Sequence, residues 1–187
     1  GFEVIKDENE PEKTGQAKTS IEDDIERSLR RTIKTIRDYT LCNRFEHLAT
    51  FTFNPEKSTR FDIPKVKIQM YDWLKNQQKR KGKFQYVIVP ELHKSGALHF
   101  HALFKGYEGE ILESVSAKTG RKVIKYGMQK YFIPSFTLGY TDISPIDNKK
   151  ESHLKVSGYL CKYITKDMLR FAGQKRYWAS TGLRLPL

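Results

Sequence analysis

Hydrophobic residues recur at intervals of three and four positions in three segments of the chain, and this spacing predicts three helices. The first is expected to begin at Ser20, because residues 20–23 resemble a capping box with Asp23 at the N3 position. The second is expected over residues 64–79 with Asp62 as its cap, and the third over residues 152–170. The inward faces of the first two are predicted to hold Ile21, Ile25, Leu29, Ile33 and Ile36, and Val66, Met70, Trp73, Leu74 and Gln77.

Shorter segments rich in β-branched and aromatic residues predict strands. The first covers residues 47–53 and is ended by Asn54-Pro55, and the second covers residues 84–89. A third strand carries His99 and His101, and residues 130–133 and 137–143 are expected to form two more. Between them we expect a short helix over residues 106–117 and a turn at Thr119-Gly120.

Charge is distributed unevenly along the chain, which has 187 residues. The 34 basic and 22 acidic residues give a net charge of +12, but residues 1–24 hold eight acids and three bases, which leaves +17 for the remainder. A domain this basic is typical of proteins that bind phosphate groups, and nucleic acid is the expected partner. A membrane is not expected, because no signal peptide and no long apolar run is present.

The same composition predicts the domain organisation. Residues 1–19 are acidic and polar and lack hydrophobic periodicity, so they are predicted to form a flexible arm, and residues 20–187 are predicted to form one domain. Cys42 and Cys161 lack the spacing of a zinc finger and are expected to be free thiols in a reducing cytoplasm.

The sequence His99-Phe100-His101 places two imidazoles on one face of its predicted strand, because alternate side chains of a strand leave on opposite faces. The turn at residues 94–96 pairs this strand with the preceding one and brings Glu91 back beside the two histidines. Two nitrogens and one carboxylate oxygen are a suitable start for a divalent metal site with positions open for a substrate. Histidines at this spacing also occur on exposed strand faces without a ligand.

The third predicted helix carries Tyr159, Lys162, Tyr163 and Lys166 on one face, because each residue advances the helix by about 100°. Two phenols one turn apart beside two ammonium groups suit nucleophilic attack on phosphate, since the cations lower the cost of forming a phenolate. Tyrosines at the boundary of an amphipathic helix explain the same pattern without chemistry. The apolar stripe of this helix is separate and consists of Val156, Leu160, Ile164 and Met168.

Basic and aromatic residues also interleave in the segment between the second and third predicted helices. Stacking surfaces between cations suit single-stranded nucleic acid, although edge-strand lysines and core aromatics produce the same pattern. The overall charge favours the first interpretation. The predicted DNA-binding residues are Arg121, Lys122, Lys125, Tyr126, Lys130 and Tyr131.

These motifs together resemble those of the HUH endonucleases, which start rolling-circle replication, relax conjugative plasmids and move some transposons. Residues 48–53 resemble the first motif of that superfamily, and residues 91–101 resemble its metal motif, with a glutamate eight residues before the first histidine. Residues 159–166 resemble the paired-tyrosine motif of phage initiators and Helitron-like transposases. The order of the motifs resembles Rep-type initiators, whereas relaxases carry their tyrosine near the N-terminus. The resemblance covers most of residues 20–187.

The resemblance implies an α+β fold in which a central antiparallel sheet is flanked by helices, as in ferredoxin-like and RRM domains. It implies Mg²⁺ or Mn²⁺ held by Glu91, His99 and His101. It also implies that single-stranded origin DNA is nicked and religated through a 5′-phosphotyrosine on Tyr163 or Tyr159, with Lys166 and Lys162 beside them. Geminivirus-type initiators have one tyrosine, at the position of Tyr163, so the number of nucleophiles stays open.

Further partners of such an initiator are a host helicase and a polymerase that extends the free 3′-hydroxyl. The chain shows no helicase-like motif and is expected to be a nuclease domain of a longer protein. Two alternatives remain. A single-strand transposase of the Helitron-like type uses the same chemistry on element ends, and an RRM-like module binds single strands without any chemistry.

Overall fold

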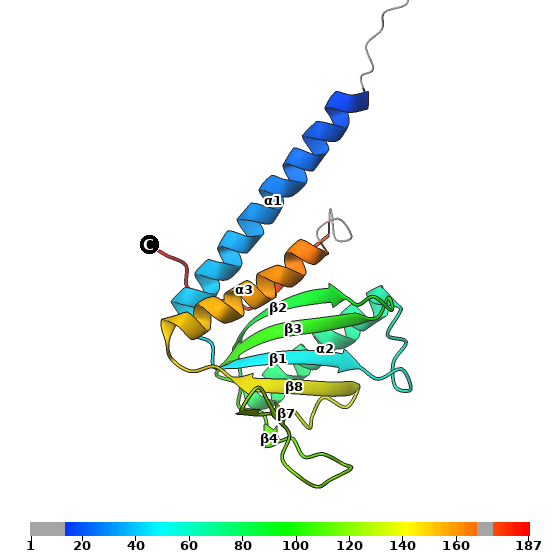
Figure 1. Ribbon diagram of the computed structural model, residues 1–187, viewed down its shortest axis with the longest axis vertical. Helices are drawn as coiled ribbons and strands as arrows, with labels where there is room; N and C mark the ends of the chain where they lie inside the picture. The colour runs from blue at the N-terminus through cyan, green and yellow to red at the C-terminus, as the bar shows by residue number, and fades with distance from the viewer. Residues whose placement is uncertain (1–13, 168–173) are drawn as a thin grey trace, which may run out of the picture.

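The computed structural model describes residues 14–167 and 174–187 (Figure 1). The helices in this part of the chain are α1 (Thr14–Asn43), α2 (Ile63–Lys81) and α3 (Lys150–Lys166). The long strands are β1 (His47–Phe53), β2 (Gln85–Leu92), β3 (Leu98–Lys105) and β8 (Gly139–Pro145). The short strands are β4 (Leu112–Glu113), β5 (Ile124–Lys125), β6 (Met128–Gln129), β7 (Tyr131–Phe132) and β9 (Trp178–Ala179).

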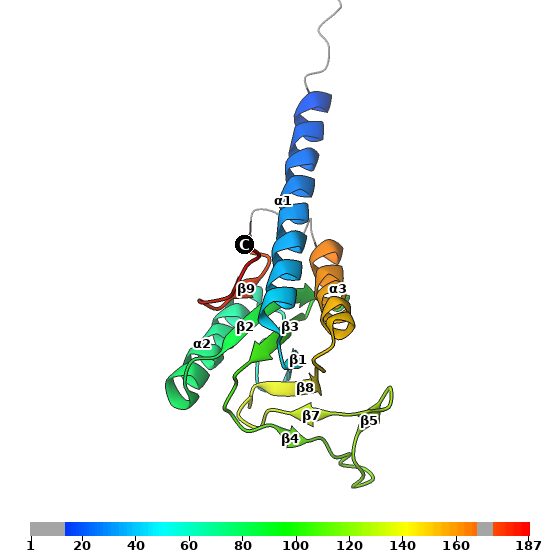
Figure 2. The same ribbon diagram turned by 90° about the vertical axis from the view of Figure 1, so that its left-hand side faces the viewer.

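Seven of these strands form one sheet in the order β4-β7-β8-β1-β3-β2-β9, and every neighbouring pair is antiparallel. Helix α2 covers one face of the sheet, and α1 and α3 lie side by side over the other (Figure 2). The expected α+β fold with a central antiparallel sheet flanked by helices is confirmed, and the order β8-β1-β3-β2 is compatible with a ferredoxin-like arrangement.

The two faces of the sheet follow from the alternation of side chains along its central strands. On β3, Phe100, Ala102 and Phe104 enter the core beneath α2, together with Phe51 of β1 and Trp73 of α2. The alternate residues face α1 and α3, where Val87, Val89 and Leu103 pack against Ile36, Leu160 and Ile164. Along β2 and β3 this second face changes from apolar to polar, because the next alternate positions are Glu91 on β2 and His101 and His99 on β3.

The predicted second helix is confirmed in detail. Asp62 caps α2 by accepting a hydrogen bond from the Lys65 backbone N–H, and all five predicted inward residues are buried. The predicted hairpin is also confirmed: Gly96 has a φ of 86°, in the left-handed region that favours glycine, and the His93 N–H donates to the Ala97 carbonyl across the turn. Cys42 and Cys161 are free thiols, as expected.

The first helix differs from its prediction at both its start and its face. Helix α1 begins at Thr14 rather than Ser20, because no proline or other strong break separates residues 14–19 from the helical segment. The predicted arm therefore falls on residues 1–13, which lie outside the described residues. Ile21 was expected to face inward but is 58% exposed, because this part of α1 projects past the sheet (Figure 1).

The helix predicted over residues 106–117 is wrong. The chain is extended there and forms β4, whose Leu112 pairs with Phe132 of β7. Gly106 has a φ of 71° and directs the chain out of β3, and Gly109 has no room for a side chain beside Tyr107. These two glycines disfavour a helix more strongly than the residues after them favour it.

The third predicted helix begins at Lys150, two residues before its expected start, and is described as far as Lys166. Its predicted last turn and Met168 fall on residues 168–173, which lie outside the described residues. The two-residue strand β9 on the outer edge of β2 was not predicted, since a segment so short has no periodicity to detect. Of the helices in the described residues, none combines the length and the apolar character that a membrane span requires.

Candidate active site

The backbone register of three strands assembles the candidate site on the sheet face beneath α3. Glu91 of β2 lies opposite His99 of β3, and His101 lies opposite Val89 on one side and Thr50 of β1 on the other. Paired residues of neighbouring strands project to the same face of a sheet. The predicted return of Glu91 to the side of His99 and His101 is therefore what the strands show.

Glu91 is the most strongly engaged side chain of the site. It is 8% exposed, its Oε2 lies 2.6 Å from His101 Nε2, and its Oε1 accepts a hydrogen bond of 2.7 Å from the Lys166 ammonium. Burial acts to raise the pKa of this carboxyl, but the hydrogen bonds and positive charges of His101 and Lys166 outweigh it and lower the pKa to about 2. Glu91 is therefore ionised, with both oxygens paired.

The two imidazoles have different surroundings. An ionised carboxylate only accepts hydrogen bonds, so His101 Nε2 carries a proton, while its Nδ1 lies 3.2 Å from the Thr50 hydroxyl and 3.4 Å from that of Tyr159. The ring of His99 stacks on that of His93 at 5.1 Å. Burial lowers the pKa of His99, and the neighbouring His93, His101 and Arg60 lower it further against the opposing effect of Glu91, which favours a neutral imidazole.

Both predicted tyrosines of α3 lie against His101. The Tyr163 ring stacks almost parallel on the imidazole, with 3.8 Å between ring centres and 7° between planes. The Tyr159 ring meets His101 edge-on at 5.5 Å and Tyr163 at 5.0 Å. Burial raises the pKa of Tyr163 above its ordinary value, and hydrogen bonding and charge coupling to Tyr159 and the charge of Glu91 raise it further. Tyr163 is therefore a neutral phenol in this arrangement.

The two predicted lysines of α3 occupy different positions. Lys166 reaches down to Glu91, whereas Lys162 is exposed and its ammonium lies 5.8 Å from the centre of the Tyr163 ring. We expected these cations to favour a phenolate, but the larger effect on Tyr163 is burial, and the nearer cation is paired with a carboxylate.

Two residues at the site were missed by the sequence prediction. Asp167, which is 2% exposed, follows the last residue of α3 and accepts a hydrogen bond of 2.8 Å from the Leu92 backbone N–H. This contact fastens the C-terminal end of α3 to the residue after Glu91. Thr50 places its hydroxyl beside His101 Nδ1. Thr50 faced the site in the expected register of the sheet, but no sequence pattern indicates a buried aspartate at a helix end.

Glu91, His99 and His101 stay predictions as metal ligands. Among the described residues, no three His, Cys, Asp or Glu side chains are arranged to hold a metal ion as they stand. The chemistry of the set nevertheless suits a divalent cation, since it offers an ionised carboxylate and a neutral imidazole at paired positions of one sheet face, with a second imidazole two residues along.

The predicted DNA-binding residues lie apart from this cluster, in the segment between β4 and β8. Tyr126 is fully exposed at the turn between β5 and β6, where its φ of 51° is in the left-handed region. Lys130 is directed at β8, where it donates to the Ser144 hydroxyl at 2.6 Å. Lys122 pairs with Glu113 at 3.0 Å, and Lys125 lies 3.9 Å from the Asp142 carboxylate. The remaining two are Arg121, which is exposed, and Tyr131, which packs against the core.

The comparison with protein families decides the identity of the fold that carries this cluster. The model of the replication-associated protein ORF2 family matches residues 46–168, a span that includes every residue of the cluster from Thr50 to Asp167. The chain belongs to this family. Searches of curated proteins and of solved structures returned no significant match. As a replication-associated protein, the chain carries its tyrosine–histidine–glutamate cluster within the part that the family shares.

Asp167 provides a test of how α3 is held over the sheet of this replication-associated protein. Asp167→Ala leaves the Leu92 N–H without its acceptor, and we expect the free energy of unfolding in urea to fall by about 1–3 kcal/mol. Asp167→Asn keeps an acceptor oxygen and should lose less. The matched control is Asp72→Ala on the exposed face of α2, expected within about 0.5 kcal/mol of the wild type. Equal stability of the Asp167→Ala and Asp72→Ala variants would contradict this role.

Proposed function

We propose that this replication-associated protein is the nuclease domain of a rolling-circle replication initiator, of the HUH type. In this proposal it nicks one strand of single-stranded origin DNA and later rejoins it. The observation that carries the proposal is the contact of two α3 tyrosines with His101, next to the paired Glu91, within the span that matches a replication-associated family. The binding of single-stranded DNA is supported by the net charge of +12.

Glu91, His99 and His101 would hold Mg²⁺ or Mn²⁺. The bound cation would polarise the scissile phosphate and stabilise the negative charge that develops on its oxygens. Glu91 Oε1 is occupied by the Lys166 ammonium in the present arrangement, so Lys166 would have to leave that oxygen for the carboxylate to act as a ligand. The released ammonium would then lie one helical turn from Tyr163.

The proposed reaction is a transfer of the phosphate between two oxygens. The Tyr163 oxygen forms a bond to phosphorus, and the bond from phosphorus to the 3′-oxygen breaks. The phenol loses its proton, and the departing 3′-oxygen gains one, which leaves a 5′-phosphotyrosine and a free 3′-hydroxyl. The raised pKa of Tyr163 means that its proton must be removed during attack rather than before it. The reverse reaction rejoins the strand without a nucleotide cofactor.

A covalent adduct tests this proposal. Incubation with single-stranded origin oligonucleotides and Mn²⁺ should give a protein–DNA adduct that survives denaturation and is seen as a shift in electrophoresis. His101→Ala should abolish the adduct while keeping most of the affinity for single strands, because phosphate contacts supply most of the binding. The control His47→Ala, on β1 opposite Phe104, should form the adduct normally. Binding without an adduct in the wild type would leave an RRM-like module.

The two tyrosines are expected to act in turn. Tyr163 matches the single tyrosine of related initiators, and Tyr159 lies one turn away against the same imidazole. Tyr163→Phe should lose most of the first cleavage, by roughly 100-fold or more. Tyr159→Phe should keep the first cleavage and be impaired in later strand transfer. Mass spectrometry of the trapped adduct identifies the residue, and DNA on Tyr159 in the first turnover would reverse the order.

The pairing of Lys166 with Glu91 makes a prediction about metal binding itself. Lys166→Gln removes the cation that competes for Glu91, so the affinity for Mn²⁺ should rise by about tenfold, measured by electron paramagnetic resonance of free Mn²⁺. Lys162→Gln removes the same charge from the same helix without touching Glu91 and should change the affinity much less. Unchanged or weaker Mn²⁺ binding by Lys166→Gln would show that Lys166 does not occupy the ligand position.

A further inference from the structure

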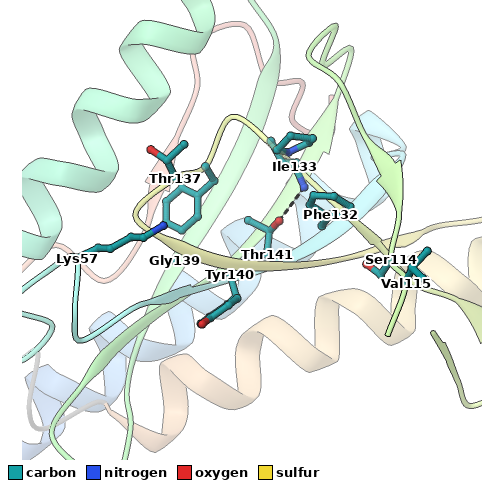
Figure 3. A pocket seen from close by; sticks show the side chains of 11 residues that line it. Lys57, Ser114, Val115, Phe132, Ile133, Thr137, Gly139, Tyr140 and Thr141 are labelled. Carbon is teal, nitrogen blue, oxygen red and sulfur yellow. Dashed lines mark hydrogen bonds between the residues drawn. The ribbon is translucent and has the colours of Figure 1, made fainter. Parts of the chain in front are cut away.

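A cleft of about 470 Å³ opens between the end of β7 and the start of β8 (Figure 3). We call it the β7–β8 cleft. The two strands are paired in register at Tyr131 and Ile143. Beyond that pair, the Ile133 N–H donates to the Thr141 hydroxyl oxygen at 2.7 Å instead of to a backbone carbonyl. This side-chain contact replaces a backbone contact between the strands, and the cleft lies where their backbones diverge.

The β7–β8 cleft has a rigid apolar floor. Ile133 and Phe136 are 1% and 3% exposed, and the Phe136 ring packs edge-on against Phe51, Phe53 and Trp73 of the core. Phe132 and Val115 form further walls. An apolar, preformed cavity with a few polar groups is the usual form of a site for a small planar molecule.

The polar groups of the β7–β8 cleft suit a nucleotide. Of the described residues that line it, Lys57 is the only charged one, and none is acidic. Thr141 uses its oxygen as an acceptor for Ile133, and its hydroxyl proton has no acceptor among the described residues, so it is free to donate to a ligand. A base with its phosphate at the mouth would meet one hydrogen-bond donor and one cation.

The position of the cleft connects it with the candidate active site. Tyr140, at the edge of the cleft, lies opposite Thr52 of β1, and Thr52 lies opposite His99 of β3. These three residues form a row across neighbouring strands, so Tyr140 is about 10 Å from His99 along the same face. Its side chain is 65% exposed, and Figure 3 shows it directed away from the cleft on the side that faces α3.

We infer that the β7–β8 cleft binds one nucleotide of the strand that is cut, close to the scissile phosphate. The base enters the cleft over Phe136, the Lys57 ammonium pairs with its phosphate, and Tyr140 stacks on the adjoining base between the cleft and His99. This inference rests on the proposed function, because it takes the DNA path from the candidate active site. It adds a subsite that fixes the position of the strand on the sheet.

The affinity for a single strand tests Tyr140 and Lys57. The measurement uses fluorescence anisotropy of a labelled thymidine oligonucleotide, with the double variant Tyr159→Phe/Tyr163→Phe as background so that no covalent reaction occurs. Added Tyr140→Ala should weaken binding roughly tenfold, since base stacking contributes at that scale, and Tyr140→Phe should restore it. Tyr71→Ala and Lys79→Gln on exposed positions of α2, which covers the opposite face, are the matched controls for Tyr140→Ala and Lys57→Gln.

The cleft itself is tested by filling and by crosslinking. Thr137 lines it and is exposed, so Thr137→Trp should keep the thermal unfolding temperature and weaken binding as Tyr140→Ala does. Origin oligonucleotides with a single 5-iododeoxyuridine, moved one position at a time, should crosslink to residues 132–141 from one position near the cut. Crosslinks that fall elsewhere, or full affinity in Thr137→Trp, would overturn the inference.

The two proposals fail differently. If the wild type forms the covalent adduct with Mn²⁺ but gives no crosslink in the β7–β8 cleft, the subsite is wrong and the proposed function stands. If the wild type neither forms the adduct nor binds single strands, the proposed function fails and the subsite fails with it.

Discussion

The carboxylate of Glu91 is ionised and almost fully buried, and a buried charge is costly unless it is paired and hydrogen-bonded. Three elements meet to satisfy it. Strand β2 carries it, β3 brings His101 to one oxygen, and α3 brings Lys166 to the other. The position of α3 over the sheet is tied to this charge, and Asp167 ties it further by holding the backbone of Leu92. The two tyrosines are placed by the same helix.

This pairing has a cost for the chemistry that the cluster suggests. Protein cations neutralise Glu91, and Tyr163 lies flat against His101 as a neutral phenol whose pKa is raised by burial. The arrangement is stable because every strong group has a partner. It is also a resting arrangement, since the groups that would act on a phosphate are occupied with one another. Productive binding would have to exchange Lys166 for another cation and expose the Tyr163 oxygen.

The sequence predicted the site as far as backbone periodicity determines it. The period of two placed Glu91, His99 and His101 on one face of the sheet, and the helical period placed the tyrosines and lysines of α3 on one side. The partners of each group were beyond reach, because the rotation of α3 over the sheet and the rotamer of Lys166 depend on tertiary packing. The start of α1 was misplaced because Ser20 is a good local cap that the preceding helical residues override. The β7–β8 cleft depends on a single side chain, Thr141, that replaces a backbone contact, and no periodic pattern encodes that.

The β2–β3 hairpin divides the chain into positions that tolerate a change of length and positions that do not. One residue inserted between Val87 and Glu91 would turn Glu91 toward the core beneath α2, because a slip of one position exchanges the faces of a strand. Residues 93–97 form the turn beyond the last register pair, Leu92 with Leu98, so added residues there leave every pair in place. For protein engineering, this turn is the place to insert a tag or a fused domain close to the candidate active site.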